Sequence, residues 1–259
     1  MIVDIHCHYA HPFADQRVRL DEAGIDRSVL VAAVDHLEDA HDLDSYRRLR
    51  CDGLQHVGWS GDAGPVNAAC VELAAAVQKH RGRFLGFALP PQGRPMAENQ
   101  AWLVDVLDQG YQGLGEVILP AGGADGVANL LRAAHDHGGL PILFSSYPPA
   151  TGDDISRLGG LAGEYPANTI IIGHLGGYDT ARACELALAH PNIFIDTSTN
   201  FNRLALLLCI VECPEKLIFG TNYPYCDPHT SRIHVERTVA DKGLLRQIMG
   251  LTACRILDI

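Results

Sequence analysis

Short apolar runs alternate with amphipathic stretches along almost the whole chain. Near-continuous apolar runs of strand length suit parallel strands that are buried on both faces. Eight such runs fall at residues 1–9, 25–34, 83–89, 113–119, 140–145, 169–174, 193–196 and 216–220. Predicted helices, with apolar residues at helical spacing, fall at residues 17–24, 66–80, 97–109, 126–137, 153–165, 180–189, 201–212, 231–240 and 244–257. Eight repeated strand–helix units predict an α/β protein, a single (β/α)8 TIM-type barrel.

One polar stretch interrupts this rhythm. Residues 35–65 carry few apolar positions, and we expect them to form a long irregular loop. Long loops in compact domains tend to be lids or binding segments, so substrate specificity is expected here and in the loop at residues 223–231. We find no linker, repeat or low-complexity tract, which predicts one domain over residues 1–259.

Composition narrows the functional classes. The chain has 259 residues, 47% of them hydrophobic, and a net charge of -11. This acidity argues against a nucleic-acid binder. No apolar run has the length of a membrane span, and the eight cysteines are scattered without a C-x-x-C pair. These features predict a cytoplasmic protein with a small-molecule substrate, and the helix-rich exterior suggests a homodimer.

Polar side chains stand where the predicted strands end. Active sites of such barrels form at the C-terminal ends of the strands. We therefore expect the following side chains to gather at one mouth of the barrel: His6, His8, Glu116, Ser145, Ser146, His174, Asp196 and Asn222.

The pair His6 and His8 lies in the first predicted strand. Strand side chains alternate between faces, so both imidazoles point the same way and Cys7 points the other way. Two imidazoles on one face can bind a divalent ion or hold an anionic substrate group. The alternative is two surface histidines near a terminus. For His174, at the end of the sixth strand, the alternative is a neutral core histidine.

Glu116 lies inside an otherwise apolar strand. A buried carboxylate must be paired, bound to a cation or protonated. It is therefore a candidate acid/base catalyst or metal ligand, and we expect burial to raise its pKa. The alternative is a structural salt bridge, for example to an arginine.

The remaining candidates are assigned to substrate positioning. Asn222, which we count with His174 and Glu116 as a candidate catalytic residue, can orient a substrate through both atoms of its amide group, and serine hydroxyls can donate hydrogen bonds to the substrate. Asp196 is expected to cap the helix that follows it. The predicted substrate-binding side chains are Ser145, Ser146, Tyr147, Tyr223 and Tyr225.

Several motifs, in order, carry a family resemblance. They are DIHCH at 4–8, DEAGID at 21–26, RFLGF at 83–87, LPILF at 140–144, IGHLGG at 172–177 and FGTNYP at 219–224. The chain resembles the amidohydrolase superfamily, in particular the amidohydrolase-2 branch that includes aminocarboxymuconate-semialdehyde decarboxylase-like enzymes.

The resemblance implies a metal centre with two altered positions. In the family, a metal such as zinc or manganese sits on the H-x-H pair, a histidine ending the fifth strand and an aspartate ending the eighth. His6 and His8 match the pair, and His174 matches a sixth-strand histidine that orients water or substrate. Ser145 and Asn222 stand at the other two positions and are weaker ligands. Glu116 is a candidate third ligand, and the alternative that the resemblance implies is a metal-independent enzyme, like lactonases of the same family.

The resulting expectation is a hydrolase that acts on a lactone, amide or related bond in a small anionic substrate, with weakened or absent metal dependence. One alternative is a metal-dependent decarboxylase, or lyase, of a small unsaturated or aromatic carboxylate. A second alternative is a catalytically degenerate barrel that binds a ligand or a partner protein without turnover.

Overall fold

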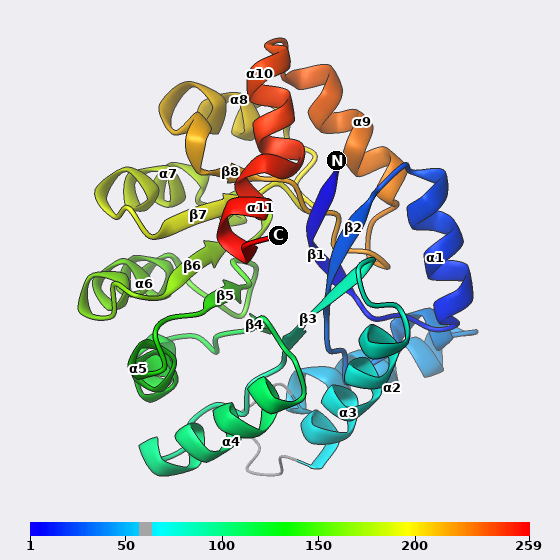
Figure 1. Ribbon diagram of the computed structural model, residues 1–259, viewed down its shortest axis with the longest axis vertical. Helices are drawn as coiled ribbons and strands as arrows, with labels where there is room; N and C mark the ends of the chain where they lie inside the picture. Colours follow the sequence, from blue (N-terminus) through cyan, green and yellow to red (C-terminus); the bar gives the residue numbers. More distant parts are fainter. Residues whose placement is uncertain (57–63) are drawn as a thin grey trace.

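Eight parallel strands form a barrel (Figure 1). The computed structural model describes residues 1–56 and 64–259, and side chains outside 51–63. Each strand pairs with its sequence neighbour, in the order β1 to β8. This confirms the predicted (β/α)8 architecture. The strands are β1 (Val3–His8), β2 (Arg27–Val31), β3 (Phe84–Ala88), β4 (Gly113–Val117), β5 (Pro141–Phe144), β6 (Thr169–Ile172), β7 (Ile193–Asp196) and β8 (Leu217–Ile218).

Backbone hydrogen bonds between β1 and the β8 end close the barrel. The Ile5 amide donates to the carbonyl of Phe219 at 3.0 Å, and the His8 amide donates to that of Tyr223 at 2.7 Å. An isolated parallel bridge joins Cys7 to Tyr223. The segment after β8 is thereby held against the strand that carries both histidines of the H-x-H pair.

Helices surround the barrel and also cover one of its ends (Figure 1). The larger apolar cluster lies between strands and helices, and a second cluster fills the barrel interior together with Ala253 and Leu257 of the C-terminal helix. No helix in the described part of the chain has both the length and the hydrophobicity to span a membrane. The α-helices are α1 (Phe13–Glu22), α2 (Leu43–His56), α3 (Gly64–Lys79), α4 (Met96–Asp108), α5 (Ala128–Asp136), α6 (Gly152–Glu164), α7 (Thr180–Ala189), α8 (Arg203–Glu212), α9 (Pro228–Thr238), α10 (Lys242–Arg246) and α11 (Thr252–Leu257). Shorter helices are η1 (Leu37–Asp39), η2 (Ala124–Val127), η3 (His174–Gly176), η4 (Pro214–Lys216) and the π-helical η5 (Gln247–Leu251).

The prediction of a long irregular loop at residues 35–65 was wrong. This stretch holds η1 and the 14-residue helix α2, and α3 begins at Gly64. The side chain of Asp42 accepts hydrogen bonds from the Ser45 amide and hydroxyl, as at a helix N-terminus. This acidic cap was the available signal, but α2 is rich in charged residues and has few apolar ones. Residues 57–63, also within the predicted loop, lie outside the described residues.

Strand β1 is irregular, and the irregularity places the histidines. Its register with β2 shifts between Asp4 and Cys7. Ile5 packs in the barrel interior, whereas Cys7 packs in the cluster between sheet and helices. Strict alternation from Ile5 would turn Cys7 inward and both histidines outward. The shift reverses the faces, as bulges do beside active sites, so that His6 and His8 point into the barrel mouth.

A register shift in strand β4 likewise turns Glu116 into the barrel mouth. The register of this strand with β5 shifts between Leu114 and Val117, and both of these side chains pack outside the barrel. Gly115 at the shift has a φ of 134°, and a Cβ atom there would lie 2.7 Å from the carbonyl oxygen of Leu143. Only glycine suits this position, and it turns Glu116 inward.

Candidate active site

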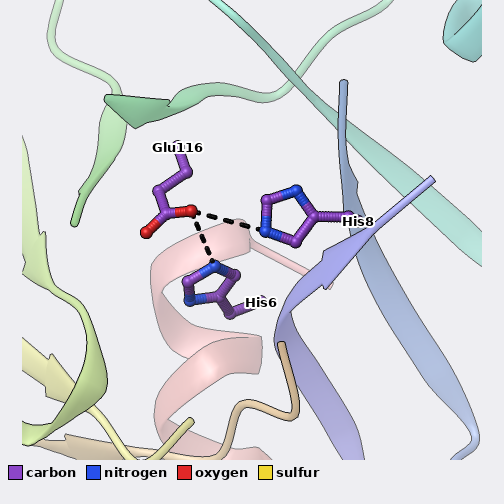
Figure 2. Close-up of side chains that lie close together, drawn as sticks. All are labelled: His6, His8 and Glu116. Atoms are coloured by element: carbon purple, nitrogen blue, oxygen red, sulfur yellow. Dashed lines mark ion pairs between the residues drawn. The ribbon is translucent and has the colours of Figure 1, made fainter. Parts of the chain in front are cut away.

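Three buried side chains from two strands meet at the barrel mouth. Nε2 of His6 lies 3.5 Å from Oε2 of Glu116, and Nε2 of His8 lies 3.4 Å from the same oxygen. Figure 2 shows both imidazoles turned toward this carboxylate. The three residues are 0%, 8% and 6% exposed, respectively. The arrangement brings together two imidazole nitrogens and one carboxylate oxygen.

These spacings fit a divalent ion better than hydrogen bonds. Metal–nitrogen distances of about 2.0–2.1 Å imply donor–donor edges of about 3.3–3.4 Å in a tetrahedral site. The His6–Glu116 and His8–Glu116 distances are close to this edge and longer than a good hydrogen bond. His6 Nε2 is fully buried and has no hydrogen-bond partner. Such an atom needs a ligand, so the residues present fit a divalent cation.

Asp196 orients the ring of His6 by contacting its Nδ1 atom. Its Oδ2 lies 2.9 Å from His6 Nδ1, and both side chains are completely buried. A carboxylate on Nδ1 fixes the tautomer and leaves Nε2 free to bind, as in metal-ligating histidines. Burial opposes a charge on His6, but Asp196 and Glu116 outweigh it and raise its pKa to about 10. The surroundings of His6 therefore favour a positive charge at this site, which a cation bound at Nε2 would supply in place of a proton.

The pKa of Glu116 was predicted in the wrong direction. Burial acts to raise it, but the charge of His6, the hydrogen bond from His174 and the nearby imidazole of His8 hold the pKa well below its ordinary value of 4.5. The partners of this carboxylate are thus three imidazoles and not the arginine weighed as an alternative. Glu116 is ionised at neutral pH, which suits a metal ligand and weakens it as a base.

His174 connects Glu116 to a serine. Its Nε2 lies 2.9 Å from Oε1 of Glu116, and its Nδ1 lies 2.9 Å from Oγ of Ser198. His174 and Leu175 have φ values of 58° and 52°, a left-handed conformation rare for such residues. The Asp196 carboxylate accepts the His174 amide at 3.2 Å and helps to hold this turn. Strain of this kind is concentrated at functional sites.

Asn222 and Ser145 flank the histidines. Oδ1 of Asn222 lies 2.9 Å from Nε2 of His8, and its amide nitrogen donates to Oγ1 of Thr199 at 2.6 Å. Asn222 Oδ1 can accept a hydrogen bond from His8 Nε2 or face an ion bound there. Oγ of Ser145 lies 3.4 Å from Nε2 of His174. Both side chains touch a histidine, and both are nearly buried.

A cavity of about 250 Å³ opens onto this cluster. Its wall is mainly apolar, and Tyr147 stacks on the His174 ring with centroids 4.7 Å apart. Arg50, near the middle of α2, supplies the one lysine or arginine side chain that lines it among the described residues. The cavity is lined by His8, Val31, Ala32, Ala33, Val34, Asp35, Leu37, Leu49, Arg50, Leu89, Glu116, Ile118, Ser145, Tyr147, Pro148, His174, Asn222 and Tyr225.

Three sequence assignments change with the structure. The Ser146 hydroxyl donates to the carbonyl of Gly173, and Tyr223 packs against the outer core, so neither lines the cavity. Asp196 does not cap the next helix, because Asn202 does. Asp196 instead binds His6 and the amides of His174 and Ser198. Its position at a strand end was the signal for this role.

Sequence reasoning missed two further residues. Ser198 bridges the rings of His6 and His174, with its Oγ 3.1 and 2.9 Å from their Nδ1 atoms. Arg50 reaches the cavity only because α2 forms where a loop was expected. Serine and arginine in polar stretches carry no sequence signal that separates them from ordinary surface residues.

The sequence profile of one protein family, described as Amidohydrolase (Amidohydro_2), matches residues 3–259. The chain belongs to the amidohydrolase family. This family member brings the ring of His6 within 5.4 Å of that of His8 and within 5.0 Å of that of His174, centroid to centroid. Comparison with curated protein sequences gives no match.

Solved structures of similar fold include decarboxylases and a hydrolase. A 2,6-dihydroxybenzoate decarboxylase complexed with 2,6-dihydroxybenzoate is 18% identical, with a TM-score of 0.70 over 100% of this chain and 99% of that one. A dihydroxybenzoic acid decarboxylase from Polaromonas, with bound manganese and 2-nitroresorcinol, is 18% identical, with a TM-score of 0.66 over 99% and 96%. A probable 2-pyrone-4,6-dicarboxylic acid hydrolase from Acinetobacter baumannii, with citric acid bound, is 17% identical, with a TM-score of 0.66 over 100% and 99%.

At these identities the likeness to the solved structures establishes the shared fold. The family and its structural neighbours together indicate an enzyme of the amidohydrolase superfamily. The reaction and the metal must be argued from the residues of this amidohydrolase-family chain.

Proposed function

We propose that this protein is a decarboxylase of a small aromatic carboxylate and depends on a divalent ion held by His6, His8 and Glu116. The observation that carries the proposal is the buried, unpartnered Nε2 of His6, which faces Glu116 beside the cavity. Support comes from neighbours that act on dihydroxybenzoates, one of them with bound manganese.

Decarboxylation suits these residues better than the hydrolysis expected from the sequence. Hydrolysis in this fold needs a base that takes a proton from water. Asn222 cannot accept that proton, and the lowered pKa of Glu116 makes it a weak base. Decarboxylation needs a cation to hold the carboxylate and an acid to protonate the ring. The presence of asparagine at position 222 should therefore impair decarboxylation less than hydrolysis.

The cavity matches a single-ring anionic substrate. Its volume of about 250 Å³ lies below the usual range for drug-sized ligands. The apolar side chains of Val34, Leu89 and Ile118 would pack on the ring, and Tyr147 would cover the face next to His174. Arg50 at the mouth would attract the carboxylate and orient it.

The reaction then requires one proton transfer. A divalent ion held by His6, His8 and Glu116 would supply positive charge that stabilises the negative charge of the bound substrate. His174, held by Ser198 and Glu116, would donate a proton to the ring carbon that bears the carboxylate. A carbon–hydrogen bond forms there, the carbon–carbon bond breaks, and its electron pair returns to the ring as carbon dioxide leaves. Ser145 would bind a substrate oxygen beside His174.

The test is a product assay on a panel of substrates. Purified protein with added manganese or zinc is incubated with dihydroxybenzoates, carboxylated methoxyphenols and, separately, lactones of pyrone dicarboxylates. We expect carbon dioxide and the decarboxylated ring from at least one aromatic acid. We also expect His8→Ala to reduce this rate by at least about 100-fold, since it removes an ion ligand.

Two results would contradict the proposal. Lactone opening without carbon dioxide release would favour the hydrolase expected from the sequence. Binding of aromatic acids without turnover, at every metal tested, would favour a degenerate barrel.

A further inference from the structure

A second histidine–carboxylate cluster lies beside the barrel mouth and shares no residue with the candidate active site. We call it the rim cluster, and it comprises His11, His36, Glu38, Asp39 and Glu72. His11 follows β1, His36 immediately precedes η1, and Glu72 belongs to α3. Three separate segments of the chain therefore converge there.

The contacts within the rim cluster are specific. His11 Nε2 lies 2.9 Å from Oε1 of Glu72, and its Nδ1 lies 3.7 Å from Oδ2 of Asp39. His36 Nδ1 lies 2.9 Å from Oε1 of Glu38, which also accepts the His11 amide at 2.8 Å. The Nδ1 atom of each imidazole thus faces a carboxylate of η1. For His36, the hydrogen bond to Glu38 is the arrangement that orients a histidine for metal binding through Nε2, whereas Asp39 lies beyond hydrogen-bond distance of His11.

The charge of the rim cluster favours a cation. It holds three carboxylates and two imidazoles, so its charge is negative while the imidazoles are neutral. Within the described residues, every side-chain ion pair of these carboxylates goes to His11 or His36, and none goes to lysine or arginine. One ring nitrogen of each histidine and one oxygen of Glu72 lie within 4.8 Å of one another.

We propose that the rim cluster binds a second divalent metal ion of the zinc class through His11, His36 and Glu72. Two imidazoles and one carboxylate form a ligand set that zinc uses with water completing the site. Glu38 holds the Nδ1 atom of His36 through its hydrogen bond, and Asp39 adds negative charge beside the Nδ1 atom of His11.

Binding requires a small rearrangement of the two rings. They stack with centroids 3.8 Å apart and planes 10° apart. A metal lies near the plane of each imidazole that binds it, so both rings must tilt out of this parallel stack. The His11 side chain is 35% exposed, which leaves room for the movement.

The rim cluster lies next to the cavity wall, so an ion bound there would affect the active site. Val34, Asp35 and Leu37 line the cavity and flank His36 in the chain. An ion that ties His36 to Glu72 would fix this part of the cavity wall against α3. We therefore expect the second ion to change substrate KM more than kcat.

The experiment counts zinc ions per chain by equilibrium dialysis and elemental analysis. We expect two zinc ions per chain for the wild type. We expect one zinc ion per chain for His36→Ala and for the conservative variant Glu72→Gln. The matched control is His41→Ala, because His41 is an exposed histidine of the same segment beside a carboxylate. It should keep two. Circular dichroism verifies that each variant is folded.

A background lacking the active-site ligands separates this proposal from the proposed function. His6→Ala/His8→Ala protein should bind one zinc, and adding His36→Ala should weaken that binding at least about tenfold. If wild-type protein binds one ion that only His36→Ala removes, the rim site stands and the catalytic metal fails. If His36→Ala and Glu72→Gln bind as much zinc as the wild type, or if His41→Ala loses as much as they do, the rim site is refuted.

Discussion

Asn222 differs from an aspartate by one atom and by one negative charge, and this difference in charge decides what His8 meets. Its Oδ1 lies 2.9 Å from His8 Nε2, where a carboxylate would add a full negative charge. The backbone at Asn222 has a φ of 58°, a conformation that asparagine and aspartate both tolerate. The position can therefore be exchanged without strain.

We predict that Asn222→Asp raises metal affinity by at least about tenfold, because an anionic ligand replaces a neutral amide. Competition with a chelating indicator measures this affinity. Asn129→Asp on α5 adds the same charge away from the cavity and should leave the affinity unchanged. Equal affinity in wild type and Asn222→Asp would show that position 222 does not face the ion.

His174 is the proton donor in the proposed reaction. We predict that His174→Gln lowers kcat by about 10²–10⁴-fold, the usual contribution of a general acid. Glutamine retains hydrogen-bonding capacity toward Ser198 and Glu116 but has no transferable proton, so substrate KM should change little. Steady-state kinetics on the assigned substrate measures both constants. A kcat within threefold of the wild type would remove His174 from the proton-donor role.

Much of the residue set could be predicted because the strand-end rule names positions directly. It indicated His6, His8, Glu116 and His174, and the structure places all four together. The pKa of Glu116 could not be predicted in the same way. The direction of its shift depends on three imidazoles that other strands bring next to the carboxylate. A sequence indicates which residues are buried more readily than it indicates which side chains lie beside them.

At the scale of elements, small irregularities decide which side chains enter the mouth. The register shifts in β1 and β4 turn His6, His8 and Glu116 inward. A period-two pattern assumes a regular strand and gives no sign of a shift. For Glu116, only Gly115 was a hint, since glycine inside a strand often marks a bulge.

Helix α2 contributes the arginine of the cavity. We predict that Arg50→Ala raises the KM for an aromatic carboxylate by about tenfold or more, because a charge-assisted contact is lost. The value of kcat should change less. Arg47→Ala is the matched control, since Arg47 lies on the same helix, pairs with Asp44 and does not line the cavity. Equal KM values in both variants would place the substrate carboxylate elsewhere.

The segment around η1 has a pH-dependent ion pair. Burial acts to raise the pKa of Glu38, but hydrogen bonds from His36 and the His11 amide lower it below 4.5. Burial acts to lower the pKa of His36, but Glu38 raises it above 6.5. The stability from this pair is fully present between those two values. It is lost as pH falls through the folded pKa of Glu38 or rises through that of His36.

We predict that Glu38→Gln destabilises chelator-treated protein by up to about 1 kcal/mol near pH 5.5 and by less near pH 9. Urea unfolding at the two pH values measures the difference. Glu98→Gln is the control, because its partner Arg94 stays charged at both. A Glu38→Gln effect that is identical at both pH values would refute the His36 pairing.

At the scale of the whole molecule, the barrel could be predicted from the sequence, but the C-terminal helix that closes one of its ends could not. Eight apolar runs and their spacing indicated the strand order that the structure confirms. The interior is completed by Ala253 and Leu257 from the C-terminal helix, which packs with β1 and β8. This contact joins distant parts of the chain, and no local pattern encodes it. It leaves the opposite end of the barrel open for the cavity.

The central claim is that one ion at His6, His8 and Glu116 serves decarboxylation. The most direct test titrates manganese into chelator-treated protein while recording labelled carbon dioxide from a carboxyl-labelled dihydroxybenzoate. We predict release that rises from near zero to a plateau with added ion and stays near zero in His6→Ala/His8→Ala protein. Full release without added ion, or an unchanged titration in the double variant, would contradict the account.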